Sequence, residues 1–244
     1  MQITFNPAYS YKPGFTSNTR TVRNKSGQLL YRNTTNFFRS DLNWKEFGNF
    51  IKEKYKNVDK VNIFNYACSD GSESMSLVIL LKELLGADSE KFLPVIAKDI
   101  DSTVIYMANS NYVNMDYSDY EAINKLSGGN FGKYFVFPMG GIGIEADSPV
   151  RVRPELNGQI KYSTADIRQD IQNIPDKNTI LFCRNFWPYI KDGRAALVQK
   201  LAENLQNNGL LVTGNYDNTV ELPELLSLNG FKRVKDLSNV YEIK

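Results

Sequence analysis

Histidine is absent from all 244 residues. Its absence excludes Ser-His-Asp and Cys-His catalysis, zinc held by histidine, and proton transfer by an imidazole near neutral pH. Cysteine is nearly absent as well, because only Cys68 and Cys183 are present. Two cysteines cannot stabilise a chain of this length with disulfides, so we expect both to be reduced thiols. We predict no metal site.

Long apolar runs are also missing. The longest, Leu77 to Leu81, stops at Lys82 and is far shorter than the roughly 20 residues that a bilayer-spanning helix needs. Residues 1–7 contain no apolar core of the signal-peptide type. With 42% hydrophobic and 23% charged residues, the composition is that of a globular protein of one or two domains. We therefore expect a cytoplasmic protein with no membrane insertion.

The charge is unevenly distributed along the chain. The net charge is only +2, yet residues 1–40 contain basic residues and no acidic ones. We interpret residues 1–32 as a basic N-terminal arm, with a hairpin-like stretch at 21–31. The excess charge can mark contact with an acidic partner or anionic ligand, or it can be solvated surface, and the sequence leaves both open. No nucleic-acid partner is expected.

From residue 61 onward, apolar runs of strand length alternate with amphipathic stretches of helical period. This alternation predicts an α/β fold with a doubly wound, mostly parallel sheet. A surface helix is expected before it, at 36–55. The predicted strands are 61–66, 93–98, 179–182 and 210–213, the predicted helices are 74–85, 102–110, 192–206 and 222–228, and a terminal strand pair is expected at 231–237 and 240–243.

Residues 112–160 interrupt this alternation. Short β-like runs at 134–137 and 150–153 are separated by glycine-rich turns at 127–129 and 140–143. We predict a small antiparallel β-subdomain, inserted into a sheet domain that spans residues 33–244.

Polar residues occur at four places where we expect strands of the sheet to end, and an open α/β sheet binds its ligands at such strand ends. They are ACSDGSES (67–74), KDID (98–101), TAD (164–166) and CRNFWPY (183–189). The first loop has only Gly71 and lacks the GxGxxG pattern, which disfavours a dinucleotide cradle and an NAD-linked oxidoreductase. The combination of acids, small residues and aromatics suits a nucleoside ligand without a pyrophosphate.

Five segments resemble the CheR-type chemotaxis receptor glutamate methyltransferases in order and spacing. They are NTTNFFR (33–39), ACSDGSESMSL (67–77), KDID (98–101), VRVR (150–153) and CRNFWPYI (183–190). The resemblance covers about residues 30–215. It implies a Rossmann-like class I methyltransferase fold, in which the last of seven strands is antiparallel. It also implies the cofactor S-adenosyl-L-methionine (SAM) and the product S-adenosyl-L-homocysteine (SAH).

The resemblance also implies roles for individual residues. Arg39 and Tyr189 would lie close to the transferred methyl group, as the catalytic residues. Taken singly, Arg39 can instead be a surface residue, Tyr189 a core aromatic and Asp166 a helix cap. The residues expected to bind the cofactor are Asn33, Thr35, Arg39, Glu73, Asp99, Asp166, Ile167, Arg184 and Asn185.

The implied reaction is methyl transfer to a carboxylate, as on a glutamate side chain of a protein such as a chemoreceptor. A carboxylate is ionised at pH 7, so a chain without histidine is not at a disadvantage. The sequence departs from the family in lacking the usual N-terminal helical domain, and in the pair Trp187-Pro188. A methyltransferase for another protein or for a small molecule, and a non-catalytic SAM-binding module, therefore stay open.

Overall fold

A seven-stranded sheet forms the centre of the computed structural model, which describes residues 19–23, 29–136 and 148–243. The strand order is β11-β12-β10-β9-β3-β4-β8. β12 is antiparallel to both of its neighbours, and the other strands run in one direction. The strands are β3 (Asn62–Tyr66), β4 (Val95–Asp99), β8 (Ile160–Thr164), β9 (Thr179–Cys183), β10 (Leu210–Val212), β11 (Phe231–Arg233) and β12 (Val240–Ile243). The expected seven-stranded sheet, in which the last strand along the chain is antiparallel, is confirmed.

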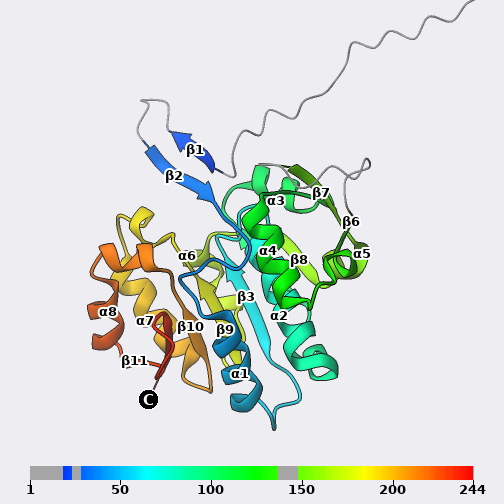
Figure 1. Cartoon of the computed structure of the whole chain (residues 1–244). Helices are drawn as coiled ribbons and strands as arrows, with labels where there is room; N and C mark the ends of the chain where they lie inside the picture. Colours follow the sequence, from blue (N-terminus) through cyan, green and yellow to red (C-terminus); the bar gives the residue numbers. More distant parts are fainter. Residues whose placement is uncertain (1–18, 24–28, 137–147, 244) are drawn as a thin grey trace, which may run out of the picture.

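Helices cover both faces of this sheet (Figure 1). Successive residues of the strands point to opposite faces, so Ile63 packs with α1 and α2 while Phe64 packs with α7 and α8. α2 is buried around most of its circumference, which explains its nearly continuous apolar sequence. The helices are α1 (Trp44–Lys54), α2 (Ser72–Leu85), α3 (Ser102–Ala108), α4 (Tyr117–Leu126), α5 (Pro154–Asn157), α6 (Ile167–Asp170), α7 (Arg194–Leu205) and α8 (Leu222–Leu228), with short 3-10 helices η1 (Gly86–Phe92), η2 (Phe131–Lys133), η3 (Ile171–Asn173), η4 (Trp187–Tyr189) and η5 (Asn215–Thr219).

The first helix is shorter than its sequence pattern predicts. A helix over 36–55 is wrong, because α1 begins only at Trp44. The Asn43 side chain caps it by accepting a hydrogen bond from the Glu46 amide at 3.3 Å. Phe37 and Phe38 have helical spacing relative to the later aromatics, but Phe38 has a φ of 45° and lies in a loop. Residues 36–42 therefore connect the hairpin to α1 and are not helical.

The region between β5 and β7 forms a second, smaller sheet, which we call the insertion. Its three antiparallel strands have the order β5-β7-β6 and confirm the expected β-subdomain. They are β5 (Tyr112–Met115), β6 (Phe135–Val136) and β7 (Ser148–Val152). The sequence pattern gave no indication of α4, which lies within this insertion. The second glycine-rich turn, at 140–143, lies outside the described residues, and residue 160 belongs to β8 of the main sheet.

The expected hairpin before the sheet is present as β1 (Thr19–Arg23) paired antiparallel with β2 (Leu29–Thr34). Its turn lies outside the described residues. In Figure 1 the hairpin projects above the carboxyl ends of the central strands. None of the helices among the described residues has the length and apolar character needed to cross a membrane.

Candidate functional site

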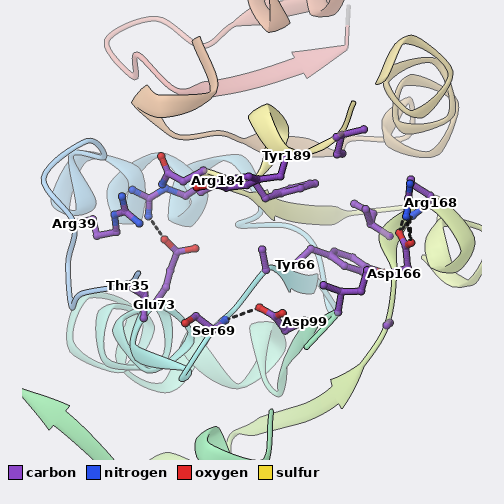
Figure 2. Close-up of a pocket in the computed structure, with 17 residues that line it drawn as sticks. Thr35, Arg39, Tyr66, Ser69, Glu73, Asp99, Asp166, Arg168, Arg184 and Tyr189 are labelled. Atoms are coloured by element: carbon purple, nitrogen blue, oxygen red, sulfur yellow. Dashed lines mark hydrogen bonds and ion pairs between the residues drawn. The ribbon is translucent and has the colours of Figure 1, made fainter. Parts of the chain in front are cut away.

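A pocket of about 300 Å³ opens at the carboxyl ends of the central strands (Figure 2). Nine of the ten residues predicted from the sequence line it, and the side chain of the tenth, Asn33, is outside the described part of the structure. Asn33 lies on β2, opposite Arg20 of β1. The nine lining residues are Thr35, Arg39, Glu73, Asp99, Asp166, Ile167, Arg184, Asn185 and Tyr189.

Asp99 ends β4 and is 3% exposed. One carboxylate oxygen accepts a hydrogen bond from the Ser69 amide and the other from the Asp101 amide, both at 2.9 Å. Ser69 has a φ of 52°, and this backbone conformation allows its N–H to reach Asp99. Burial raises the pKa of Asp99, and the backbone hydrogen bonds oppose that rise. Asp101 caps α3 through the Thr103 amide instead of lining the pocket.

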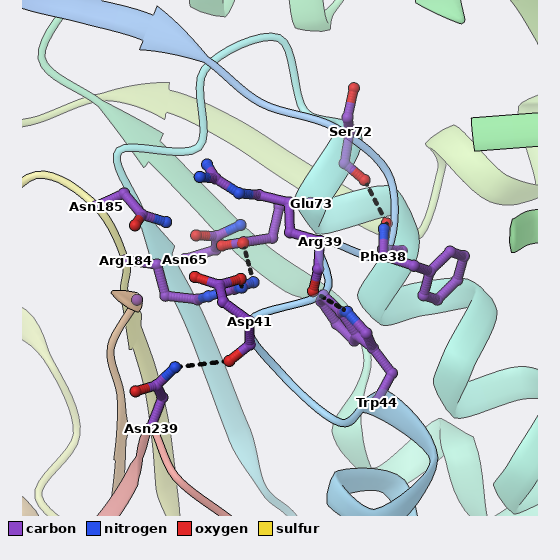
Figure 3. Close-up of polar contacts among 12 residues, drawn as sticks. Phe38, Arg39, Asp41, Trp44, Asn65, Ser72, Glu73, Arg184, Asn185 and Asn239 are labelled. Atoms are coloured by element: carbon purple, nitrogen blue, oxygen red, sulfur yellow. Dashed lines mark hydrogen bonds and ion pairs between the residues drawn. The ribbon is translucent and has the colours of Figure 1, made fainter. Parts of the chain in front are cut away.

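Glu73 and Arg184 form a buried ion pair at another wall of the pocket. Glu73 comes from the first turn of α2, and Arg184 directly follows β9. The Arg184 guanidinium also pairs with Asp41 and lies over the Trp44 ring, 5.5 Å from its centroid (Figure 3). Burial raises the pKa of Glu73, while the charges of Arg184 and Arg39 oppose that rise. One buried guanidinium is therefore shared by two carboxylates, and the nearby Arg39 adds a second positive charge.

Asp166 both lines the pocket and caps α6, because its side chain accepts a hydrogen bond from the Arg168 amide at 3.0 Å. The Arg168 guanidinium also donates to both Asp166 oxygens. These bonds hold the pKa of Asp166 below its usual value. The helix-cap reading of Asp166 is thus correct, and it does not remove the residue from the pocket.

The loop after β9 is held by a buried acid from the loop after β10. The Asp217 carboxylate accepts hydrogen bonds from the amides of Asn185 at 2.7 Å, Gly214 at 2.7 Å and Trp187 at 3.2 Å. Burial raises its pKa to about 6. A Cβ atom at Gly214 would overlap the Asn185 side-chain amide, so this close approach requires glycine.

Tyr189 ends η4 and lines the pocket, with its ring 6.2 Å from the ring of Tyr216. Arg39 reaches the pocket from the loop before α1, and its carbonyl accepts a hydrogen bond from Trp44 Nε1 at 2.9 Å. Figure 2 shows Arg39 beside Glu73 and Arg184. The catalytic roles given to Arg39 and Tyr189 stay predictions.

Sequence reasoning missed several residues of the site. Tyr66, Ser69 and Arg168 also line the pocket, and Asp41 and Asp217 hold its walls without lining it. Tyr66, Ser69 and Arg168 lie within or next to the loops that the sequence marked. Including every residue of these loops and their immediate neighbours as candidates would have found all three. No local signal marks Asp41, because its partner Arg184 is 143 residues away, and the contacts of Asp217 to the loop after β9 reach 30 and 32 residues back along the chain.

The donors and acceptors of the pocket fit a nucleoside cofactor with an amino acid tail. Asp99 offers acceptors to hydroxyl groups, and Glu73 offers a negative charge to an ammonium group. Asn185 Nδ2 is buried without a hydrogen-bond partner among the described residues. A buried donor of this kind at a pocket wall suits a ligand that brings an acceptor.

Comparison with known proteins also supports a nucleoside cofactor with an amino acid tail. The family model described as "CheR methyltransferase, SAM binding domain" matches residues 33–234. A chemotaxis protein methyltransferase of Salmonella typhimurium is 27% identical over 202 residues, which cover 82% of this chain and 66% of that protein. Chemotaxis protein methyltransferase 2 of Vibrio cholerae is 20% identical over 183 residues, covering 74% and 59%. The chain thus spans slightly less than two thirds of the length of these relatives.

Among solved structures, MNMC2 from Aquifex aeolicus superimposes with a TM-score of 0.49 at 16% identity, covering 94% of this chain and 72% of that one. The family model, by contrast, extends from the β2 strand through the main sheet to residue 234, and so includes every loop that lines the pocket. The chain therefore belongs to the family of CheR methyltransferase SAM-binding domains, and its cofactor is SAM.

Proposed function

We propose that this protein transfers the methyl group of SAM to a carboxylate, and that the acceptor is a glutamate side chain of another protein. The observation that carries the proposal is the order of the acidic residues along the pocket. In Figure 2, Asp166, Asp99 and Glu73 follow one another from one end of the pocket to the other. This order matches the order of adenine, ribose and amino acid in SAM.

Each part of the cofactor then has its own residues. Asp166 and Ile167 lie beside the adenine, and Asp99 accepts hydrogen bonds from the two ribose hydroxyls. Glu73 holds the ammonium group, and Arg184 with Asn185 forms the floor of the pocket. Thr35 and Arg39 approach from the loop before α1, and we include Asn33, near the end of β2, in the same site. In this proposal residues 33–244 form the methyltransferase domain, with the insertion at about 112–160, and residues 1–32 form a basic arm.

SAM supplies a methyl group on a positively charged sulfur, which a nucleophile displaces in line. Arg39 holds a carboxylate, either that of the cofactor or that of the acceptor, by charge-assisted hydrogen bonds. Tyr189 orients the acceptor oxygen through its hydroxyl or places its ring face next to the positive sulfur. The residues hold the two reactants in line, so most of the rate gain comes from positioning. No proton has to be removed from an ionised carboxylate.

The family supports a carboxylate acceptor on a protein. The two relatives described above carry the name chemotaxis protein methyltransferase. We propose a chemoreceptor, methylated on its cytoplasmic side, as the partner of this chain. A different protein or a small carboxylic acid would use the same pocket and the same chemistry, so the acceptor has to be found by experiment.

The test is transfer of a labelled methyl group from SAM to candidate acceptors, first to a cytoplasmic fragment of a chemoreceptor. A methyl ester is hydrolysed by mild base, whereas an N-methyl group is not. With a carboxylate acceptor, we expect a turnover rate nearly constant between pH 6 and 8 that falls only in acid. A rate that climbs through this range, together with a base-stable product, would contradict carboxyl methylation. The absence of turnover with any acceptor would favour a binding module.

A further inference from the structure

The covering segment, residues 35–39, connects the hairpin to α1 and carries two pocket residues at its ends. Thr35 and Arg39 line the pocket, whereas the two phenylalanines between them do not. Phe37 and Phe38 instead attach the covering segment to two different parts of the molecule. The location of Thr35 and Arg39 therefore depends on what holds Phe37 and Phe38.

Phe37 is held by the insertion. Its amide donates a hydrogen bond of 2.9 Å to Asp119 Oδ1 at the start of α4. Its ring packs edge to face against Phe135 of β6, with the centroids 5.6 Å apart. Phe37, Asp119 and Phe135 are all buried, with exposures of 3%, 2% and 0%. Two elements of the insertion thus contact the covering segment between its two pocket residues.

Phe38 is held on the opposite side, by α2 and α1. Its amide donates to Ser76 Oγ at 3.0 Å, and its ring packs against Trp44 with the centroids 5.3 Å apart (Figure 3). The φ of 45° at Phe38 lies in the left-handed region, which a bulky side chain adopts only where its surroundings fix it. The chain reversal that brings Arg39 to the pocket thus depends on both sets of contacts.

Asp119 is itself fixed by the first turn of α4. The Asp119 amide donates to Asp116 Oδ1 at 2.8 Å, and the Asp116 amide donates back to Asp119 Oδ2 at 3.3 Å. One carboxylate therefore closes the cap of α4 with one oxygen and holds Phe37 with the other. A shift of α4 has to move the backbone at Phe37 or break this hydrogen bond.

We infer that Asp119 of the insertion is a positioning residue for the SAM pocket. Through Phe37 it sets where Thr35 and Arg39 lie, so that the insertion and the cofactor site are mechanically coupled. This inference rests on SAM binding and not on which acceptor is methylated.

The test is titration calorimetry of SAH with the full chain. We expect Asp119→Ala to weaken SAH binding by about tenfold, within the range for loss of a hydrogen bond to a charged group. Asp119→Asn keeps an oxygen that can accept from the Phe37 amide, so it should bind SAH within about twofold of the unchanged chain. The matched control is Asp116→Ala, which removes the cap of α4 but leaves the acceptor for Phe37, and it should also stay within about twofold.

Wild-type affinity in a folded Asp119→Ala chain would overturn the inference, and so would equal weakening by Asp116→Ala. If Asp119→Ala does not fold by circular dichroism, Phe135→Leu tests the same coupling through the ring contact. It should weaken SAH binding by about threefold, the smaller effect expected when a ring contact is lost, and unchanged affinity would contradict the coupling. If no acceptor is methylated, the proposed carboxyl methylation is contradicted. The calorimetric result for SAH binding would still stand.

Discussion

Asp99 shows how a single side chain prepares the pocket for a diol. Each of its carboxylate oxygens already accepts one backbone N–H, from Ser69 and from Asp101. A carboxylate oxygen has two lone pairs, so each keeps one free for a further donor. The two backbone bonds also fix the plane of the carboxylate, and the remaining acceptor sites are thus oriented before any ligand binds.

Replacing Asp99 by alanine removes both acceptors. Loss of charge-assisted hydrogen bonds of about 1.5–3 kcal/mol should weaken SAM binding by about 10- to 150-fold. Titration calorimetry measures this directly. The control is Asp101→Ala, which loses a helix cap outside the pocket lining and should change SAM affinity little. An unaltered affinity in Asp99→Ala would move the ribose to another residue.

The Tyr189 hydroxyl belongs to the methyl-transfer step in our proposal. Tyr189→Phe keeps the ring and removes the hydroxyl, so it should lower the turnover rate by about tenfold or more while SAM affinity changes little. Tyr216→Phe is the matched control, because its ring lies 6.2 Å from that of Tyr189 and its side chain is exposed. Full activity of Tyr189→Phe on a verified acceptor would show that the hydroxyl has no catalytic role.

At the scale of elements, Asp217 joins the loop after β10 to the loop after β9. It is fully buried and accepts three backbone N–H groups, two of which belong to the loop that carries Arg184, Asn185 and Tyr189. Two strand ends are thus locked together beneath the pocket by one side chain.

Asp217→Ala leaves three buried N–H groups without a partner. At about 1–3 kcal/mol for each, the free energy of unfolding should fall by about 3 kcal/mol or more, and SAM binding should weaken because the loop moves. Urea unfolding and calorimetry measure the two effects. The exposed Asp192→Ala, in the chain just beyond this loop, should change neither. Unchanged stability in Asp217→Ala would mean that water satisfies these amides.

Elements with a strong hydrophobic pattern could be predicted, and those whose burial depends on contacts with distant elements could not. The buried strands appear in the sequence as short apolar runs, and α2 ends at Gly86 as expected. The expected helix over 36–55 failed because the aromatics at 37 and 38 are buried by the insertion, α2 and α1 rather than along one helix face. α4 was missed because its apolar face is narrow: beside the buried Ile123, only the partly buried Tyr120 and Leu126 pack against the core.

The stability of the whole molecule depends on pH in part through one buried carboxyl group, that of Asp119. Burial raises the pKa of Asp119 to about 6, and the negative charge of Asp116 adds to this rise. Asp70, in the loop after β3, adds a smaller contribution. Because the folded pKa exceeds the unfolded one, the neutral carboxyl stabilises the fold in acid, and this stability is lost as the pH rises through about 6.

In Asp119→Asn, the side chain at position 119 is an amide that does not titrate. We therefore expect the free energy of unfolding of this variant, relative to the unchanged chain, to be higher at pH 7.5 than at pH 5, by about 1–2 kcal/mol. Urea unfolding at the two pH values gives this difference, in which all other titrating groups cancel. Equal differences at both values would show that the pKa of Asp119 is not raised in the folded protein.

The pocket could be located from the sequence because parallel strands bring their carboxyl ends to one edge. The loops after β3, β4, β8 and β9 each contribute lining residues for this reason. The partners of Arg184 could not be predicted in the same way. Asp41 reaches it only because the loop before α1 lies across the sheet, an arrangement that depends on the packing of the complete fold.

The contact between Asn239 and Asp41 has a consequence for the order in which the protein matures. Asn239 Nδ2 donates to the Asp41 carbonyl at 2.6 Å and to Asn215 Oδ1 at 2.8 Å, and Asp41 in turn pairs with Arg184. A ribosome makes residue 41 long before residue 239, so a growing chain holds Asp41 without this anchor until 198 further residues have been added. The ability to retain SAM should therefore arise late, once the segment leading into β12 has left the ribosome.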